Sequence, residues 1–281
     1  MIHRADLHLH SNVSDGIHTP SQLVEMGSRL ALGGIALTDH DTIEGNREFL
    51  SAGGAKEMVR IPGVEISTEY REKEVHLLGY YVPLESERLE NRLQELEEAR
   101  IERLPKMVDK LEDLGVNING GVVNRILQNT TTPGRPHLAR ALVEEGVVED
   151  VNQAFKNYLG KKKPAYVKKD RMKTNEAIRL LKSEASVPVL AHPLTIETDD
   201  YDDFIGSLVD EGLLGIETEY NYQHLAVEGS NYEIRQIARE YNLIETGGSD
   251  HHGDDVRSLI GEVTVSMEIV DELADEAERL K

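Results

Sequence analysis

Short apolar segments alternate with helical segments along most of the 281-residue chain, and this alternation limits the folds that the chain can adopt. Apolar runs at 35–37, 187–191 and 214–216 have the length of buried strands, and each is followed by a stretch with helical spacing. So many strand–helix repeats predict a parallel sheet that closes into a barrel. In such a barrel the loops that follow the strands gather on one rim.

The first apolar segment carries residues that can bind a metal ion. In Asp6-Leu7-His8-Leu9-His10 the polar side chains recur at every second position, as on one face of a β-strand. Two imidazoles and a carboxylate on one face are close enough to share an ion such as zinc, manganese or iron. Taken alone, this stretch also fits an edge strand with solvated histidines.

Later strands carry further residues of the same types. His40, His192 and Asp250 follow apolar strands, and Glu65 lies inside one, where a lone acid is costly unless it is paired or ligates a metal. Because strand ends converge on one rim of a barrel, these residues together predict a single metal-binding region. His76 stands at the start of the apolar strand 75–80 and, by itself, also fits a buried core histidine.

Residues 85–167 depart from the strand–helix alternation. Apolar residues recur at spacings of three and four from Leu89 to Leu114, which predicts one long helix with an apolar seam. Arg100 and Arg103 stand in that seam, where leucine would be expected. They either snorkel to solvent at a kink near Pro105 or contact an anionic ligand.

A second candidate anion site follows in the same segment. Thr132-Pro133-Gly134 opens a helix whose first turn carries Arg135 and His137, and a helix N-terminus with such residues is a good phosphate cradle. We therefore predict two parts, a barrel with the metal site made of residues 1–84 and 168–281, and a helical insertion at 85–167 that covers the site or binds substrate.

Composition excludes several classes of function. The formal net charge is −21, from 52 acidic and 31 basic residues, which argues against binding duplex DNA. A small anionic substrate remains compatible with this charge if metal ions and a few cations reverse the field locally. The chain has no cysteine, which excludes disulfides and thiolate chemistry. No membrane-length apolar run and no signal peptide are found, so we expect a cytoplasmic protein without a membrane partner.

Seven stretches, spread in order over nearly the whole chain, resemble the polymerase-and-histidinol-phosphatase (PHP) family of phosphoesterases. They are Asp6-Leu7-His8-Leu9-His10, Ser14-Asp15-Gly16, Thr38-Asp39-His40-Asp41, Pro62-Gly63-Val64-Glu65, Val75-His76-Leu77-Leu78-Gly79, Ala191-His192-Pro193 and Gly248-Ser249-Asp250-His251-His252-Gly253. The resemblance implies an α/β fold, a distorted (β/α)7 barrel, with three divalent ions, manganese before zinc or iron.

The same resemblance implies which residues hold the ions. His8, His10, Glu65 and Asp250 would hold the first ion, and Asp15, His40 and His252 the second. Glu65 would bridge to a third ion held with His76 and His192. Asp6 would orient a ligand histidine instead of binding an ion.

The insertion and its Gly-Arg-Pro-His segment are most similar to the subgroup that acts on nucleoside 3′,5′-bisphosphates and on the 5′ ends of short RNA. This implies hydrolysis of a phosphomonoester, the 3′-phosphate, by a metal-bridging hydroxide. Arg100, Arg103, Arg135 and His137 would bind the phosphates of a nucleotide or short oligonucleotide. His137 would also assist the leaving oxygen.

Three other functions fit parts of the pattern. Histidinol-phosphate phosphatases use the same metals with another pocket. Amidohydrolase barrels also open with a His-x-His strand, but they typically bridge their metals with a carboxylated lysine, whereas Glu65 is the bridging candidate here. The last alternative is a non-catalytic, metal-bound regulatory module. The intact ligand set and the lack of a fused polymerase domain both count against it.

Overall fold

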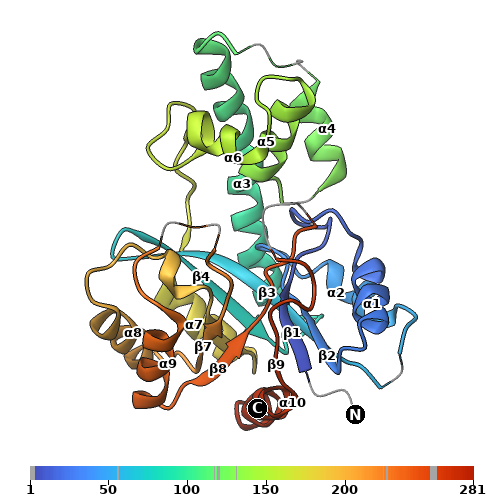
Figure 1. The fold of residues 1–281 in the computed structure, drawn as a ribbon, viewed down its shortest axis with the longest axis vertical. Helices are drawn as coiled ribbons and strands as arrows, with labels where there is room; N and C mark the ends of the chain where they lie inside the picture. Colours follow the sequence, from blue (N-terminus) through green and yellow to red (C-terminus); the bar gives the residue numbers. More distant parts are fainter. Residues whose placement is uncertain are drawn as a thin grey trace.

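A single curled sheet carries the molecule, with the insertion standing above its rim (Figure 1). The computed structural model describes residues 4–55, 57–116, 118, 121–130, 132–223, 225, 227–253 and 258–281. Within these residues the strand order is β8-β7-β6-β4-β3-β2-β1-β9, and the short β5 pairs with β3 outside this path. The strands are β1 (Arg4–Leu9), β2 (Gly34–Leu37), β3 (Val59–Tyr70), β4 (Lys73–Tyr80), β5 (Met172–Lys173), β6 (Val187–Leu190), β7 (Gly215–Glu219), β8 (Ile244–Gly247) and β9 (Val265–Ser266).

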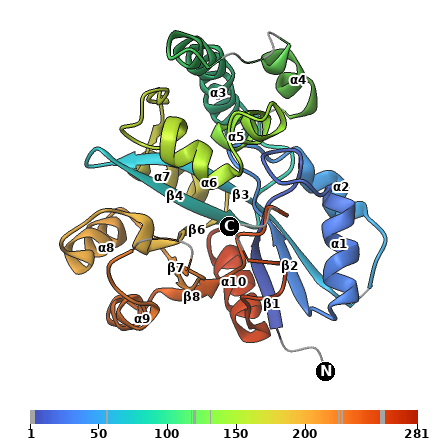
Figure 2. The same cartoon turned by 45° about the horizontal axis from the view of Figure 1, so that its top comes forward.

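Helices lie around the outside of the sheet, except α10 (Met267–Arg279), which lies below the strands at the end opposite the insertion (Figure 1 and Figure 2). The helices around the outside are α1 (Pro20–Arg29), α2 (Gly45–Ser51), α7 (Thr174–Ser183), α8 (Tyr201–Asp210) and α9 (Asn231–Glu240). In α1, Thr19 accepts a hydrogen bond from the Gln22 amide while the Gln22 side chain bonds back, a capping box that the sequence Thr-Pro-Ser-Gln predicts. Among the described helices, none is both long and apolar enough to cross a membrane.

The barrel nearly closes between β1 and the segment that follows β8. Leu9 pairs with His251, and the His10 amide donates to the His251 carbonyl at 3.0 Å. At Gly248 a Cβ atom would lie 2.4 Å from the backbone nitrogen of His8, so only glycine permits this approach. The distorted TIM-like barrel expected from the sequence is confirmed.

The sheet is not parallel throughout, and here the expectation of a parallel sheet was wrong. β4 runs antiparallel to both β3 and β6. It follows β3 through a tight hairpin in which Arg71 (φ 48°) and Glu72 (φ 63°) adopt the left-handed conformation that two-residue hairpin turns require. Because β4 is reversed, its first residues lie at the rim where the parallel strands end, and this places His76 there.

The sequence at 260–265 also predicts a last strand before the terminal helix, and this prediction is largely wrong. Only Val265–Ser266 is extended, as β9, and it pairs antiparallel with β1. The preceding residues turn at Gly261 (φ 80°), whose amide donates to the Asp6 carboxylate at 2.8 Å. This bond holds the chain in a turn where the apolar alternation predicts a strand.

The insertion contains α3 (Glu87–Asp113), α4 (Val122–Asn129), α5 (Arg135–Glu144), α6 (Val151–Ala154) and a π-helical turn at Phe155–Leu159. The first half of α3 packs on the barrel through Leu89, Leu93 and Leu96. Its second half, from Leu104 to Leu111, packs with the other insertion helices in a separate core. Arg100 and Arg103 lie between the two cores, which explains why arginines interrupt the leucine seam. The boundaries at 85 and 167 stay a prediction.

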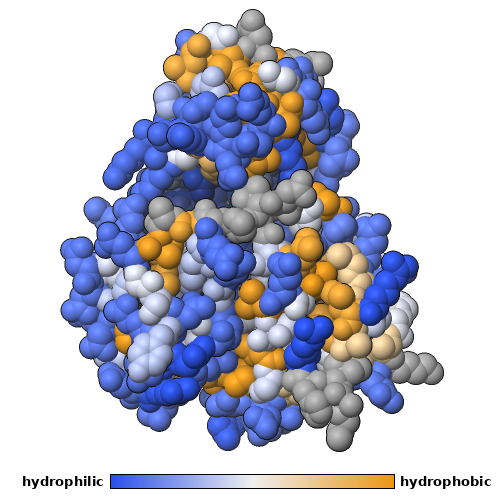
Figure 3. Space-filling view, viewed as in Figure 1, coloured by the Kyte–Doolittle hydropathy of each residue, from blue (hydrophilic) through white to orange (hydrophobic). Residues whose placement is uncertain are grey.

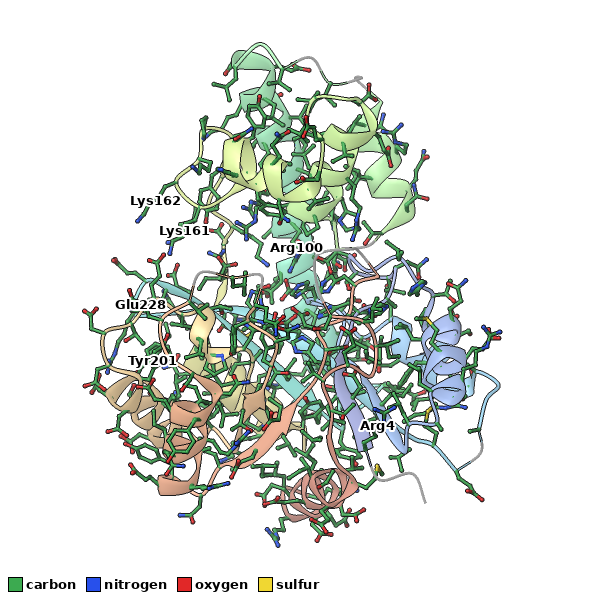
Figure 4. All side chains as sticks on the ribbon, in the orientation of Figure 1. Arg4, Arg100, Lys161, Lys162, Tyr201 and Glu228 are labelled. Atoms are coloured by element: carbon green, nitrogen blue, oxygen red, sulfur yellow. The ribbon has the colours of Figure 1, made fainter. Side chains whose placement is uncertain are left out.

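The junction of insertion and barrel is polar. The face in Figure 3 is mostly hydrophilic and is hollowed between the two parts. In Figure 4 Arg100 lies at this junction, and Lys161 and Lys162 project from an insertion loop at its side. The hollow is therefore a candidate binding site for an anionic ligand.

Candidate active site

Glu65 of β3 is the centre of a buried group of histidines. Its carboxylate oxygens lie 2.8 Å from His76 Nδ1, 2.9 Å from His192 Nε2, 2.9 Å from His40 Nδ1, 3.2 Å from His10 Nε2 and 3.5 Å from His8 Nε2. These histidines come from β1, β4 and the ends of β2 and β6. The strand ends therefore meet at one carboxylate, as the barrel rim predicts.

Three groups in the described residues have the geometry to hold a metal ion, each with its candidate ligand atoms within 4.8 Å of one another. They are His8, His10, Glu65 and Asp250; His10, Asp15, His40 and His252; and His40, Glu65 and His76. All nine expected ligands lie in or beside these groups, since His192 also contacts Glu65 at 2.9 Å. His10 and His40 each join a second group that the sequence did not assign to them.

Several histidines hold one ring nitrogen in a bond to the protein and turn the other toward the cluster. His8 Nδ1 lies 2.9 Å from the Glu217 carboxylate, and His192 Nδ1 lies 3.0 Å from the Thr195 hydroxyl. His252 Nδ1 lies 2.8 Å from the Asp250 carbonyl, and its Nε2 lies 3.0 Å from Asp15 Oδ1. With the ring proton on Nδ1, each of these histidines would offer its Nε2 lone pair to an ion.

Buried atoms in the cluster also lack hydrogen bonds. In the described part of the chain His10 Nδ1, Asp15 Oδ1 and Glu65 Oε2 are buried without one, although ring nitrogens lie 3.0 Å from Asp15 Oδ1 and 2.9 Å from Glu65 Oε2. Burial alone would raise the pKa of Glu65, but His40, His76 and His8 outweigh it and hold the pKa of this carboxyl well below its usual range. Burial lowers the pKa of His40 to about 4. Burial also lowers the pKa of His10 and His76, but the surrounding carboxylates outweigh it and raise both pKa values to about 9. So many buried carboxylates around imidazoles fit divalent cations, which would take the place of these protons.

The loop that carries Asp15 is fixed by a buried neighbour. Asp39 accepts hydrogen bonds from the Ser11 amide and hydroxyl, both at 2.7 Å, and from the Ser14 hydroxyl at 2.6 Å.

Two of the candidate ligands have a strained backbone. The backbone is left-handed at His192 (φ 26°) and Asp250 (φ 51°). Such strained conformations are typical of functional sites.

Asp6 acts on the backbone and not on an imidazole. Its carboxylate accepts from the amides of Ser249 at 2.9 Å and Gly261 at 2.8 Å, with a longer bond from the His8 amide at 3.4 Å. No bond from Asp6 to a histidine ring is found among the described residues. Asp6 thus joins β1 to the segment that carries Asp250. If Asp6 orients a ligand histidine, as predicted, it does so through the backbone.

The arginines of the insertion differ in their partners. Arg100 Nε lies 2.6 Å from Asp41 Oδ2, and its Nη2 donates to the Ser67 hydroxyl at 2.9 Å. Arg103 is 8% exposed, and its Nε and Nη2 have no hydrogen bond in the described residues. Burial, and then the neighbouring Arg135, lower the pKa of Arg103 to about 9. Arg103 is therefore a stronger candidate than Arg100 for binding an anion.

Arg135 and His137 lie at the N-terminus of α5. Arg135 Nη2 lies 3.8 Å from Glu74 Oε1 and faces the rings of Phe155 and Tyr166. His137 Nδ1 accepts from the Gly134 amide at 3.1 Å. Burial lowers the pKa of His137 to about 4, against the charge of Asp15 and then a backbone bond to Ser14, which both raise it. His137 thus has structural partners, and its predicted contact with substrate stays a prediction.

A cavity of about 760 Å³ separates the metal cluster from the insertion. His40, Glu65, His192 and Asp250 line its floor, and Arg135 and Phe155 line its roof. The cavity is large enough for a small organic ligand. A ligand in it would touch the metal cluster and the insertion at once.

The sequence model of the PHP domain matches residues 6–226 of this chain. The chain belongs to the PHP family. The family resemblance is therefore confirmed, and six of the seven motifs lie within the matched residues.

Relatives of this PHP protein are enzymes. A 5′-3′ exoribonuclease from Haemophilus influenzae is 31% identical over 257 residues, which cover 90% of this chain and 91% of that protein. A 3′,5′-nucleoside bisphosphate phosphatase from Chromobacterium violaceum is 32% identical over 188 residues, which cover 67% of this chain and 66% of that protein.

Solved structures agree with this assignment. A protein from Bifidobacterium adolescentis, provisionally assigned as a metal-dependent phosphoesterase, has a TM-score of 0.87 at 29% identity and covers 97% of this chain and 96% of its own. A Chromobacterium violaceum protein described as an amidohydrolase, solved with bound sulfate and no metal, has a TM-score of 0.84 at 26% identity, with coverages of 97% and 96%. The chain is thus a metal-dependent phosphoesterase, a hydrolase of phosphate esters.

Four residues of the PHP site escaped the sequence analysis: Glu74, Lys169, Arg171 and Glu217. Glu217 is 1% exposed, binds His8 Nδ1 and accepts from the His192 amide at 2.7 Å. An acid in an apolar strand is the signal that singled out Glu65, and Glu217 carries it too. Lys169 and Arg171 lie in the return from the insertion, where no pattern in the sequence marks them.

Replacing Glu217 by glutamine is expected to weaken divalent metal binding by about 10- to 100-fold, because an amide cannot hold the His8 tautomer as a carboxylate does. Calorimetric metal titration measures this, with kcat/KM as a second readout. Glu219→Gln, on the same strand but paired with Arg235, is the matched control and should bind metal normally. Equal metal affinity in the Glu217 variant and the wild type would refute this role.

Proposed function

We propose that this PHP enzyme removes the 3′-phosphate of nucleoside 3′,5′-bisphosphates and also acts on the 5′ ends of short RNA. The observation that carries the proposal is one cavity with two sides suited to phosphate. The carboxylate–histidine cluster, which would attract anions once divalent ions are bound, lies on its floor, and Arg135 and Lys161 of the insertion line the other side, with Arg103 next to Arg135. A substrate with two phosphates would use both sides. The exoribonuclease and bisphosphate phosphatase relatives support the same class of substrate.

Three divalent ions, Mn²⁺ before Zn²⁺ or Fe²⁺, would be held by His8, His10, Asp15, His40, Glu65, His76, His192, Asp250 and His252. When bound, such ions activate water and neutralise phosphoryl oxygens. Glu65 lies between the groups and keeps them together. Burial excludes bulk water from this cluster, which strengthens the electrostatic effect of every charge in it.

The insertion would bind the phosphate that does not react. Arg103 and Arg135 supply guanidinium groups suited to phosphate, and Arg100 adds charge from its ion pair with Asp41. A fixed second phosphate orients the 3′-phosphate over the cluster, so binding energy remote from the reaction lowers the entropic cost of reaching the transition state. His137 would assist the leaving oxygen.

Assays on alternative substrates distinguish this proposal from the histidinol-phosphate phosphatase and amidohydrolase alternatives. Manganese-loaded protein should release phosphate from adenosine 3′,5′-bisphosphate with a higher kcat/KM than from histidinol phosphate. The reverse order would favour histidinol-phosphate phosphatase. Turnover of an amide substrate without phosphate release would favour the amidohydrolase alternative.

Replacing Arg103 by leucine is expected to raise KM for adenosine 3′,5′-bisphosphate about tenfold or more, because a charge-assisted bond to phosphate contributes about 1.5–3 kcal/mol. KM for adenosine 3′-monophosphate, which has no second phosphate, should change little. Steady-state kinetics on both substrates measures the difference. Arg88→Leu, an exposed position near the start of α3, is the control. An unchanged KM for the bisphosphate would return Arg103 to a purely structural role.

A further inference from the structure

Glu74 of β4 lies between the metal cluster and the arginines. Its Oε2 lies 2.7 Å from Arg171 Nη2, while its Oε1 lies 3.8 Å from Arg135 Nη2 and 3.6 Å from His76 Nε2. Glu74 lines the cavity, whereas the Arg171 side chain is 4% exposed and is not part of the lining. The carboxylate therefore stands between Arg171 and any ligand in the cavity.

The arginines around Glu74 have more positive charge than this one carboxylate balances. Arg103, Arg135 and Arg171 gather beside Tyr166, and Arg103 keeps two guanidinium nitrogens without a hydrogen bond in the described residues. Burying a charge without a partner is unfavourable. Of the three, Arg135 lines the cavity, and the other two add their positive charge from beside it, so this side of the cavity is a site for an anion.

We propose that Glu74 is an internal anion that competes with the non-reacting phosphate of the substrate for Arg171 and Arg135. This inference rests on the proposed function, and it adds Arg171 to the groups that bind that phosphate. In the free protein the Glu74 carboxylate bonds Arg171. A phosphate that enters takes over contacts with the arginines at the expense of this ion pair.

The consequence is that Glu74 limits the affinity of the enzyme for the non-reacting phosphate. The non-reacting phosphate is the same in substrate and product, so its contacts strengthen the binding of both equally and do not raise kcat. A pocket of three unopposed arginines would hold the product, adenosine 5′-monophosphate, tightly. Glu74 weakens that binding and favours product release.

The test is Glu74→Gln, which keeps the shape of the side chain and removes its charge. Isothermal calorimetry with adenosine 5′-monophosphate should show about tenfold tighter binding than in the wild type, the effect of one charged contact. KM for adenosine 3′,5′-bisphosphate should fall by a similar factor, with no change for adenosine 3′-monophosphate. In Glu74→Gln/Arg171→Met the gain should disappear, because Arg171 is the group that Glu74 releases.

Glu72→Gln, on the same hairpin and also lining the cavity, is the matched control and should bind the nucleotide as the wild type does. If Glu74 only positions His76, its variant will lose kcat equally on both substrates and bind adenosine 5′-monophosphate with unchanged or lower affinity, which overturns the proposal. If the wild type releases no 3′-phosphate, the proposed function fails. The calorimetric comparison still decides whether Glu74 opposes phosphate binding, because it requires no turnover.

Discussion

Replacing Glu65 by glutamine is expected to lower kcat/KM for phosphate esters by at least about 10³-fold, equivalent to about 4 kcal/mol of transition-state stabilisation. The reason is its position: five histidines lie within 3.5 Å of this one buried carboxylate. A neutral amide has one acceptor oxygen, no charge to attract a cation, and N–H groups that face imidazole nitrogens.

The matched control is Glu69→Gln, four residues along the same strand and on the same face. Glu69 pairs with Lys168 at 2.8 Å and Lys173 at 2.9 Å, away from the histidines. Steady-state phosphate release and metal content should be close to wild type in this control. A Glu65 variant with activity within tenfold of the wild type would contradict the central role of this carboxylate.

Replacing Asp41 by asparagine is expected to destabilise the protein by about 3–5 kcal/mol, the usual cost of removing one partner of a buried ion pair. Asp41 Oδ2 lies 2.6 Å from Arg100 Nε and 2.8 Å from Lys169 Nζ, and Oδ1 accepts from the Ser67 amide at 2.7 Å. Burial and then Arg100 lower the pKa of Lys169 to about 7. Without the Asp41 charge, both cations would be buried beside each other unopposed.

Asp41 also joins the two parts of the molecule. Arg100 belongs to α3 and Lys169 to the segment that returns from the insertion to the barrel. Both segments that connect the insertion with the barrel therefore bind Asp41, in the loop after β2. Urea unfolding measures the loss of stability. The control is Asp203→Asn at the exposed pair with Arg71, expected to cost less than about 1 kcal/mol. Equal losses in the two variants would contradict this account of Asp41.

Much of the site could be predicted because its residues stand at strand ends or in local motifs. Apolar segments followed at once by His40, His192 or Asp250 identify the rim without any knowledge of pairing. The antiparallel β4 could not be predicted in this way. Whether a strand runs up or down depends on its partners, and the sequence of 75–80 is equally apolar in both directions.

The same limit explains the missed residues. Arg171, Lys169 and Glu74 matter through contacts with side chains far away in the sequence, and such pairs leave no periodicity. Arg100 and Arg103 were visible as exceptions in a leucine seam, but only the two separate cores of α3 show why both are there. Glu217 could have been predicted, because a buried acid in an apolar strand needs a partner.

The measurement that most directly tests the metal centre is elemental analysis of the purified protein after manganese loading, run beside Glu65→Gln and Glu69→Gln. The account predicts about three equivalents of divalent metal in the wild type and in the Glu69 variant, from the three candidate groups around the cluster. It predicts a clear loss in the Glu65 variant, with phosphate release falling in parallel. Phosphatase activity that persists in wild-type protein stripped of metal by chelation would contradict it.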